Sequence, residues 1–243
     1  MKALVVGGSS GIGLSIVLNL LWRGKCECVY VVDKAPFPDT YSDNRVMYIP
    51  CDLSLGDYSC LADAEDIQAL YITAGFGHLK FFQELSEGYI QSNFSVNAVA
   101  PIQIIRHYYN RMLTGEDFSC AVLVSIAGRL SSPLFSVYSA TKAALSKFIE
   151  AVNVELDVQG SKNRILDVSP GSLKGTGFTG GPSRPELTVA LADEIIRRAE
   201  NHEELLIPQS EEVFKGGIAR YRADAHQFGV DSYWYKKNRI EEK

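Results

Sequence analysis

The stretch Gly7-Gly8-Ser9-Ser10-Gly11-Ile12-Gly13 decides how this chain folds. It stands between an apolar run, residues 3–6, and a helical pattern that continues to about Trp22, so it predicts a turn from a strand into a helix. Glycine permits a tight turn and a close approach of the backbone to a ligand, and a helix N-terminus favours negative charge. The stretch therefore predicts a loop that holds the pyrophosphate of a dinucleotide, with packing alone as the alternative reason for its glycines.

Strand-like apolar runs alternate with helical patterns along the chain, as expected for a parallel sheet joined by crossover helices. We predict an α/β fold of the three-layer Rossmann type: a doubly wound parallel sheet of six or seven strands with helices on both faces. The expected strands cover residues 3–6, 27–32, 46–49, 69–73, 121–124, 164–168 and 205–207. The expected helices cover about residues 12–22, 88–113, 138–158 and 187–200.

Composition indicates one globular domain over residues 1–243, since 46% of the residues are hydrophobic and 22% are charged. The net charge of −5 gives no basic surface for nucleic acid, and no apolar run approaches the ~20 residues that span a bilayer. The first expected strand leaves no room for a signal peptide, so we expect a cytoplasmic protein.

The four histidines are scattered along the chain, so we expect no metal site. Reduced thiols are expected at Cys26, Cys28, Cys51, Cys60 and Cys120, which contain no Cys-x-x-Cys pair.

Two segments stand apart from the alternating pattern. Residues 173–186 are rich in glycine, proline and serine, and we expect a flexible substrate loop there. Its glycine-rich part, residues 175–181, either closes over a substrate as a lid or is simply disordered. Residues 209–243 form a divergent C-terminal tail that is polar and aromatic.

A second motif follows the fifth expected strand. The sequence holds three Tyr-x-x-x-Lys matches, beginning at Tyr30, Tyr138 and Tyr233, where chance predicts roughly 0.6. Only Tyr138 opens an alanine-rich helical stretch and has a serine, Ser125, 13 residues upstream at the end of an apolar run. Residues four apart share a face of a helix, so Tyr138 and Lys142 aim a phenol and an ammonium at one place. The alternative is a surface pair without chemistry.

The acidic end of the second expected strand bears on the choice of dinucleotide. Asp33 lies 20 residues after Gly13, where a carboxylate can bind the adenosine ribose hydroxyls of NAD(H) and repels the 2′-phosphate of NADP(H). Ser10 offers that phosphate no basic contact, whereas Lys34 is the one residue that argues the other way. We therefore favour NAD(H) over NADP(H), with a solvated strand end as the alternative role of Asp33.

Taken together, the chain resembles the short-chain dehydrogenase/reductase superfamily in its single-domain form, over roughly residues 3–172. Besides the motifs above, the resemblance rests on Asp52-Leu53, Thr73-Ala74-Gly75, Asn97 and Pro170-Gly171. It implies that the cofactor is held by Gly7, Ser9, Ser10, Gly11, Ile12, Gly13, Asp33, Asp52, Leu53, Ala74, Gly75, Tyr138, Lys142, Pro170, Gly171 and Leu173.

The resemblance also implies a catalytic set, Ser125, Tyr138, Lys142 and Asn97. Tyr138 would be the general acid/base of a hydride transfer, and Lys142 and an oxidised nicotinamide would lower its pKa. Ser125 would hold the substrate oxygen, and Lys142 would also bind the nicotinamide ribose. Asn97 would hold a water that leads to Lys142, or alternatively cap a local kink inside its helix.

The chain departs from the family's pattern in four places. Val6 replaces a usual threonine, and Ile72-Thr73 replaces a usual pair of asparagines, which changes packing and turn hydrogen bonds. The stretch between Asp52 and Gly75 is short, so we expect a truncated helix there. Thr176 comes one residue later than the family's threonine, so a contact with the nicotinamide carboxamide is not carried over.

These observations predict an NAD(H)-dependent oxidoreductase that interconverts a small-molecule secondary alcohol and a ketone, or an alcohol and an aldehyde. The alternative is a non-catalytic NAD(P)(H)-binding regulatory protein, since a binding fold does not prove turnover. A nucleotide-sugar epimerase or dehydratase would need a longer chain. By resemblance we expect a homodimer through helices 88–113 and 138–158, with a tetramer possible. The candidate pocket residues are Phe76, His78, Ala127, Leu130, Phe135, Leu173 and Phe178.

Overall fold

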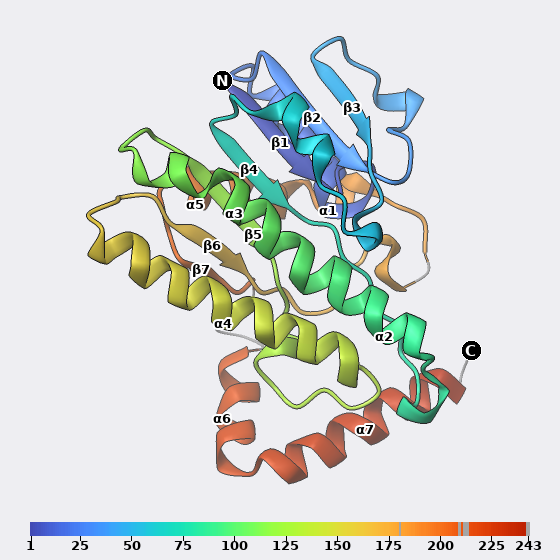
Figure 1. Ribbon diagram of the computed structural model, residues 1–243. Coiled ribbons are helices and arrows are strands. Elements are labelled where there is room, and N and C mark those ends of the chain that lie inside the picture. The colour runs from blue at the N-terminus through green and yellow to red at the C-terminus, as the bar shows by residue number, and fades with distance from the viewer. Residues whose placement is uncertain (180, 209, 211–213, 242–243) are drawn as a thin grey trace.

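Seven parallel strands form one sheet at the centre of the described part of the protein (Figure 1). The computed structural model describes residues 1–179, 181–208, 210 and 214–241. The strands follow the order β3-β2-β1-β4-β5-β6-β7, so the winding reverses between β1 and β4. The predicted fold class is confirmed. The strands are β1 (Lys2–Val6), β2 (Cys28–Asp33), β3 (Val46–Pro50), β4 (Ala69–Ile72), β5 (Ser119–Leu123), β6 (Ile165–Val168) and β7 (Leu205–Leu206).

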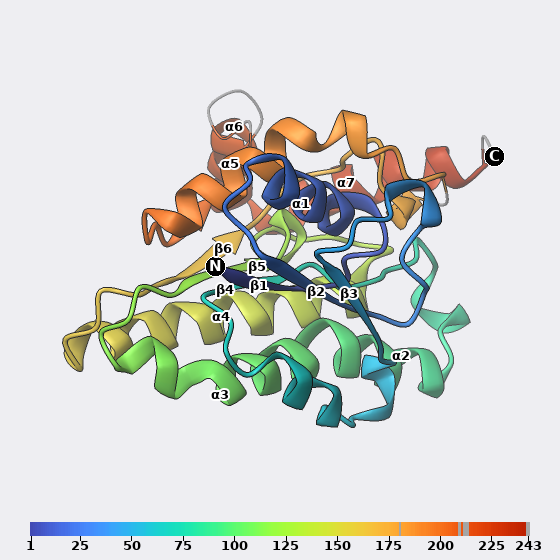
Figure 2. The same ribbon diagram turned by 90° about the horizontal axis from the view of Figure 1, so that it is seen from above.

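Helices cover both faces of the sheet, which gives the three predicted layers (Figure 2). Alternate residues of β1 point to opposite faces of the sheet. Leu4 and Val6 belong to one core cluster, and Ala3 and Val5 belong to the other. The sheet is therefore buried on both sides, as parallel sheets require. One layer holds α1 (Gly11–Trp22) and α5 (Val189–Glu200), and the other holds α2 (Glu87–Phe94), α3 (Ala100–Leu113) and α4 (Ser136–Val158).

The helix expected over residues 88–113 is not regular throughout. A π-helical turn, Ser95–Val99, separates α2 from α3, so the expected helical stretch is continuous but contains one irregular turn. The turn ends two residues before Pro101, which lacks the N–H that a regular helix would donate to the carbonyl of Asn97. Such turns often occur at functional sites, and here the turn contains a residue of the predicted catalytic set.

The connection between β3 and β4 contains two short 3₁₀ helices, Leu53–Leu55 and Ser59–Ala64, in place of an α-helix. Leu61 and Ala64 are buried and pack against the sheet. This shortened crossover agrees with the truncated helix expected from the sequence. The adenine side of the predicted cofactor site is therefore formed by 3₁₀ helices and turns.

The described parts of the two segments that stood apart in the sequence contain helices. The predicted substrate loop, described apart from residue 180, contains the 3₁₀ helices Gly177–Thr179 and Pro185–Leu187. The tail forms α6 (Lys215–Ala223) and α7 (Ala225–Glu241), whereas residues 209, 211–213 and 242–243 lie outside the described residues (Figure 1). Among the described helices, none is long and apolar enough to cross a membrane.

The tail packs against the loop that follows β5. Lys236 Nζ of α7 donates hydrogen bonds to Ser132 Oγ at 2.7 Å and to the carbonyl of Pro133 at 3.1 Å. Phe81 and Tyr233 add an aromatic contact, with ring centroids 6.5 Å apart. Burial lowers the pKa of Lys236 to about 8. The divergent tail therefore forms a wall beside the elements that carry the predicted catalytic set.

Candidate active site

The glycine-rich loop packs tightly against the end of β4. Gly7 has a φ of +84°, and a Cβ placed on it would lie 2.5 Å from the backbone nitrogen of Ala74. A Cβ on Gly13 would lie 2.1 Å from the Gly7 carbonyl oxygen. Gly7 therefore requires glycine for conformation and for space, and Gly13 requires it for space. These contacts bring the N-terminus of α1 to the point where the sheet reverses its winding, which is where open parallel sheets bind dinucleotides.

The first turn of α1 offers donors for an anion. Ser10 stands at the N-cap position but makes no side-chain cap, so its hydroxyl occupies none of the N–H groups of this turn. The N–H of Gly11 donates to the hydroxyl of Ser183 at 2.7 Å, and a Cβ on Gly11 would lie 3.6 Å from Thr176. A phosphate oxygen would make the same type of hydrogen bond as the Ser183 hydroxyl. These observations fit a dinucleotide pyrophosphate, and no sequence motif pointed to Ser183.

Asp33 lies beside the glycine-rich loop, as predicted. One carboxylate oxygen accepts from the N–H of Ser9 at 3.1 Å and the other from the N–H of Ala35 at 3.0 Å. Asp52, two residues after β3, accepts from the N–H and hydroxyl of Ser54, and these bonds lower its pKa. Both carboxylates therefore border the same edge of the sheet. Leu53 is buried next to Asp52, and the Ile12 side chain points into the core, which leaves only the Ile12 backbone for a ligand.

The predicted catalytic residues come together at the carboxyl end of β5 and the start of α4. Ser125 lies two residues after β5, and its hydroxyl lies near the phenol of Tyr138. The Ser125 Oγ also accepts from the N–H of Ala127 at 3.1 Å. Lys142, one turn after Tyr138, has its Nζ 5.8 Å from the phenol ring centroid and donates to the Leu123 carbonyl at 2.7 Å. The spacing of the motif thus produces the expected cluster.

Burial shifts the pKa values of both titratable groups in this cluster. It raises the pKa of Tyr138 to about 12, although the Ser125 hydrogen bond opposes the change. The lowered pKa predicted from the sequence is wrong for this structure, because desolvation exceeds the stabilisation of the phenolate. Burial also lowers the pKa of Lys142 to about 8, opposed by the charge of Asp167. Each group is therefore biased toward its neutral form.

Asn97 uses its side chain to organise the loop after β4. Its Oδ1 accepts from the N–H of Phe76 at 2.9 Å, and its Nδ2 donates to the Phe76 carbonyl at 2.8 Å and to Thr141 Oγ1 at 3.3 Å. A Cβ on Gly75 would lie 3.2 Å from Asn97 Oδ1 and 3.4 Å from Lys142 Nζ, so both polar groups border Gly75. Asn97 therefore lies close to Lys142, as the predicted role of holding a water requires. It also lies in an irregular helical turn, as the alternative role of capping a kink requires.

The segment after β6 lies alongside Ser125. The carbonyl of Pro170 accepts from the N–H of Ile126 at 3.1 Å and from the Ser125 hydroxyl at 3.5 Å. A Cβ on Gly171 would lie 3.3 Å from the Ile126 side chain. The Leu173 carbonyl accepts from the Thr176 hydroxyl at 3.4 Å. Residues 170–176 therefore connect Ser125 to the glycine-rich loop.

Aromatic side chains cover Tyr138. The rings of Phe178 and Phe135 have centroids 5.0 Å and 5.6 Å from that of Tyr138. A Cβ on Gly77 would lie 2.7 Å from the Tyr138 ring, a constraint that the sequence did not reveal. Of the other predicted pocket residues, Phe76 and His78 instead pack on Tyr89, and Leu130 approaches α6. The Tyr138 ring therefore lies among aromatic side chains as well as near the polar Ser125 and Lys142.

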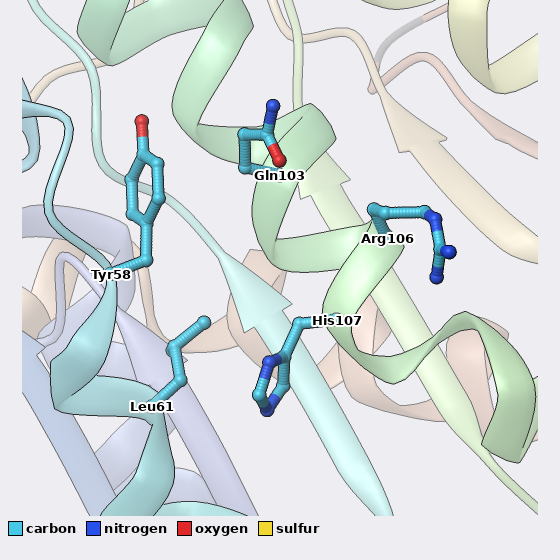
Figure 3. A pocket seen from close by; sticks show the side chains of 5 residues that line it. All are labelled: Tyr58, Leu61, Gln103, Arg106 and His107. Atoms are coloured by element: carbon cyan, nitrogen blue, oxygen red, sulfur yellow. The ribbon is translucent and has the colours of Figure 1, made fainter.

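A cavity of about 350 Å³ lies elsewhere, between the 3₁₀ helix Ser59–Ala64 and α3 (Figure 3). Its lining residues share no member with the cluster around Tyr138, so this cavity is separate from the candidate active site. The cavity is lined by Tyr58, Leu61, Gln103, Arg106 and His107.

Among the described residues, no group of three or more His, Cys, Asp or Glu side chains could hold a metal ion.

Comparison with known proteins identifies the family. Residues 1–184, well over half of the chain, match the family described as short chain dehydrogenase. The chain belongs to this family. It is similar to the Saccharomyces cerevisiae protein named Uncharacterized oxidoreductase YDL114W, with 27% identity over 210 residues that cover 80% of this chain and 66% of the yeast protein. This short-chain dehydrogenase therefore spans just under two thirds of that relative's length.

Solved structures support the same fold. A short chain dehydrogenase from Burkholderia cenocepacia J2315, solved in complex with NADP, has a TM-score of 0.72 and 20% identity, covering 93% of this chain and 94% of its own. A 4-hydroxyisoleucine dehydrogenase complexed with NADH and succinate has a TM-score of 0.69 and 21% identity, covering 84% and 96%. The two neighbours were solved with different dinucleotides, so the likeness supports the fold of this short-chain dehydrogenase without selecting NAD(H) or NADP(H).

Proposed function

We propose that this chain is an NAD(H)-dependent oxidoreductase that interconverts a secondary alcohol and a ketone, or an alcohol and an aldehyde. The observation that carries the proposal is the juxtaposition of the Tyr138 phenol, the Ser125 hydroxyl and the buried ammonium of Lys142, which lies one helical turn from Tyr138. These groups share an edge of the sheet with the glycine-rich loop. A proton donor, a hydrogen-bond donor and a cation thus meet beside a site suited to a dinucleotide.

The chain's own residues account for the proton movements. A bound nicotinamide would supply or accept the hydride. Reduction of a carbonyl leaves negative charge on its oxygen, and Tyr138 Oη donates its proton there while the Ser125 hydroxyl hydrogen-bonds the same oxygen. With a pKa of about 12, Tyr138 carries the required proton at neutral pH. In alcohol oxidation the proton returns to the phenolate.

Lys142 and Asn97 support the phenol in different ways. The ammonium of Lys142 favours the phenolate that remains on Tyr138 after proton donation, because opposite charges attract strongly in a buried site. Asn97 and Lys142 both border Gly75, which supports the expectation that Asn97 holds a water leading to Lys142. Asn97 also orients the Phe76 backbone, so its removal would affect the shape of the site as well as proton transfer.

Dinucleotide binding would use the edge of the sheet from β3 to β6. Asp33, next to the glycine-rich loop, supports the preference for NAD(H), since its carboxylate repels a 2′-phosphate. Binding of the pyrophosphate would release the Ser183 hydroxyl from the N–H of Gly11. The adenine would contact Asp52 and Leu53. The remaining proposed cofactor contacts are Ala74, Gly75, Pro170, Gly171 and Leu173.

The test is NADH oxidation against a panel of aldehydes, ketones and keto-sugars, with NADPH as the cofactor comparison. Tyr138→Phe removes the proton donor, and we expect kcat to fall at least about 100-fold while the Kd for NADH changes less than about threefold. Tyr109→Phe, whose hydroxyl contacts only Gln159 on the surface in the described structure, is the matched control and keeps its activity.

Turnover that survives in Tyr138→Phe would refute the proposed role of the phenol. Tight NADH binding by both proteins, without turnover of any compound in the panel, would favour the non-catalytic regulatory alternative.

We further propose a homodimer through the layer of α2, α3 and α4.

A further inference from the structure

Two cysteines that are nine residues apart place their sulfur atoms in contact. Cys60 Sγ lies 2.9 Å from Cys51 Sγ, and both side chains are half-buried. Cys51 directly follows β3, and Cys60 lies in the 3₁₀ helix Ser59–Ala64. The sequence predicted independent thiols here, because the spacing matches no familiar pair motif. The shortened crossover between β3 and β4 is what folds the two residues together.

We propose that Cys51 and Cys60 form a reversible disulfide that holds the adenine side of the dinucleotide site in its binding shape. The effect on binding rests on the proposed function, which assigns the adenine contacts to Asp52 and Leu53. The formation of the disulfide itself does not depend on that assignment.

The positions of the two sulfurs suit a disulfide. A disulfide bond is ~2.05 Å long, so the sulfurs must approach by less than 1 Å from their separation of 2.9 Å. The bond would close a short loop, residues 51–60, whose members include the proposed adenine contacts. A short covalent loop restricts the conformations of the segment when no ligand is bound. The arrangement seen in the structure would then be retained, with little change in shape.

Cys51 also connects this loop to the ribose side of the site. Its N–H donates to the carbonyl of Asp33 at 3.0 Å, and Asp52 caps the adjacent 3₁₀ helix by accepting from Ser54. Restricting Cys51 therefore restricts both Asp33 and Asp52. Since ordering a binding segment in advance reduces the entropy lost on binding, we expect the oxidised protein to bind an adenine nucleotide more tightly.

The oxidant is a low-molecular-weight disulfide such as glutathione disulfide. Burial, reinforced by the neighbouring Cys60 sulfur, raises the pKa of Cys51 to about 12, so Cys51 is not the first nucleophile. The thiolate of Cys60 attacks one sulfur of the oxidant, forms a mixed disulfide and releases one glutathione thiolate. Cys51 then loses its proton and attacks the Cys60 sulfur, which releases the second glutathione thiolate. Two protein thiols become one disulfide, and the two protons end on two glutathione molecules.

The experiment compares the full chain after incubation with dithiothreitol or with glutathione disulfide. Free thiols are alkylated, and peptides are mapped by mass spectrometry without reduction. The melting temperature and the Kd for AMP are measured on the same samples. Cys60→Ser removes the pair, and Cys28→Ser, a half-buried thiol at the opposite end of β2 from Asp33, is the matched control.

We expect a peptide linked through Cys51 and Cys60 in the oxidised native protein and in Cys28→Ser. Oxidation should raise the melting temperature by about 5 °C and tighten AMP binding about threefold. Neither change should occur in Cys60→Ser.

Full alkylation of both cysteines after oxidation would overturn the proposal. A linked peptide with the same Kd for AMP in both redox states would overturn the effect on binding. If the link forms but neither AMP nor NADH binds to the reduced or the oxidised protein, the proposed function fails while the disulfide is confirmed, so the two failures are distinguishable.

Discussion

Burial controls the chemistry of individual residues in this site. Tyr138 and Lys142 are 9% and 3% exposed, and each is shifted toward its neutral form. Their effects on stability have opposite signs. Between pH 8 and 10.5 the unfolded chain holds the Lys142 proton while the folded chain releases it, so stability rises with pH. Between pH 10 and 12 the unfolded chain loses the Tyr138 proton while the folded chain keeps it, so stability falls.

Lys142→Met provides a test of the first effect. In the native protein, the lowered pKa of Lys142 should add roughly 2 kcal/mol to the free energy of unfolding between pH 7.5 and 9.5. This increment should be missing in Lys142→Met, measured by urea denaturation at both pH values. An equal increase in the two proteins would mean that Lys142 keeps an ordinary pKa in the folded state.

The charge of Asp33 is expected to control the preference between NADH and NADPH. Asp33→Asn removes the charge and keeps an oxygen that can accept from the backbone, so the loop should persist while repulsion of a 2′-phosphate is lost. We expect the ratio of the Kd for NADPH to the Kd for NADH to fall about tenfold. The exposed Asp39, in a neighbouring 3₁₀ helix, gives a matched control as Asp39→Asn. An unchanged ratio in Asp33→Asn would assign cofactor preference to other residues.

At the scale of elements, close backbone contacts position the site. The glycine-rich loop meets the end of β4 at distances that leave no room for side chains at Gly7 and Gly13. The π-helical turn Ser95–Val99 aims Asn97 at the Phe76 backbone, and the loop after β6 brings Pro170 to Ser125. The site therefore depends on the junctions between elements more than on the elements alone.

Gly13→Ala tests the importance of these junctions for stability. The added Cβ would lie 2.1 Å from the Gly7 carbonyl oxygen, and relief of this clash requires the backbone to move. We expect a loss of about 2–4 kcal/mol in the free energy of unfolding, measured by urea denaturation. Gly88→Ala in α2 is the control, because a Cβ there meets no atom within 4 Å and should stabilise the helix by about 0.5–1 kcal/mol. Equal effects of the two substitutions would contradict the packing argument.

At the scale of the whole molecule, the layer of α2, α3 and α4 presents apolar side chains to solvent. Phe94, Val99 and Val154 are 38%, 45% and 59% exposed, and Val158 is 81% exposed at the end of α4. Isolated exposed apolar residues are ordinary, but these lie on the helices through which the family resemblance predicts self-association. The surface therefore supports the proposed homodimer.

Light scattering during gel filtration tests this assembly. The native chain should elute as a dimer at micromolar concentration, and Val154→Glu should shift it toward the monomer, because a buried unpaired carboxylate disfavours an interface. Met47→Glu, on the edge strand β3 and 53% exposed, should leave the dimer intact. A monomeric native protein would refute the homodimer, and equal dissociation in both variants would place the interface elsewhere.

Much of the architecture was predictable from local sequence. The order of strands and helices followed from alternating apolar patterns, and the cluster of Ser125, Tyr138 and Lys142 followed from helical spacing and its place after a strand. The contact of Ser183 with Gly11 and the pairing of Cys51 with Cys60 were not predictable. Each depends on segments that are brought together by crossovers, whose paths no local pattern specifies.

The sequence by itself determined the doubly wound sheet, the glycine-rich loop and the cluster of Ser125, Tyr138 and Lys142, because strand and helix periodicities and the steric freedom of glycine act over a few neighbouring residues. The direction of the Tyr138 pKa shift, the aromatic cover from Phe178 and the wall formed by α7 were decided only by the tertiary structure. Desolvation depends on every atom that surrounds a group, and those atoms come from distant parts of the chain.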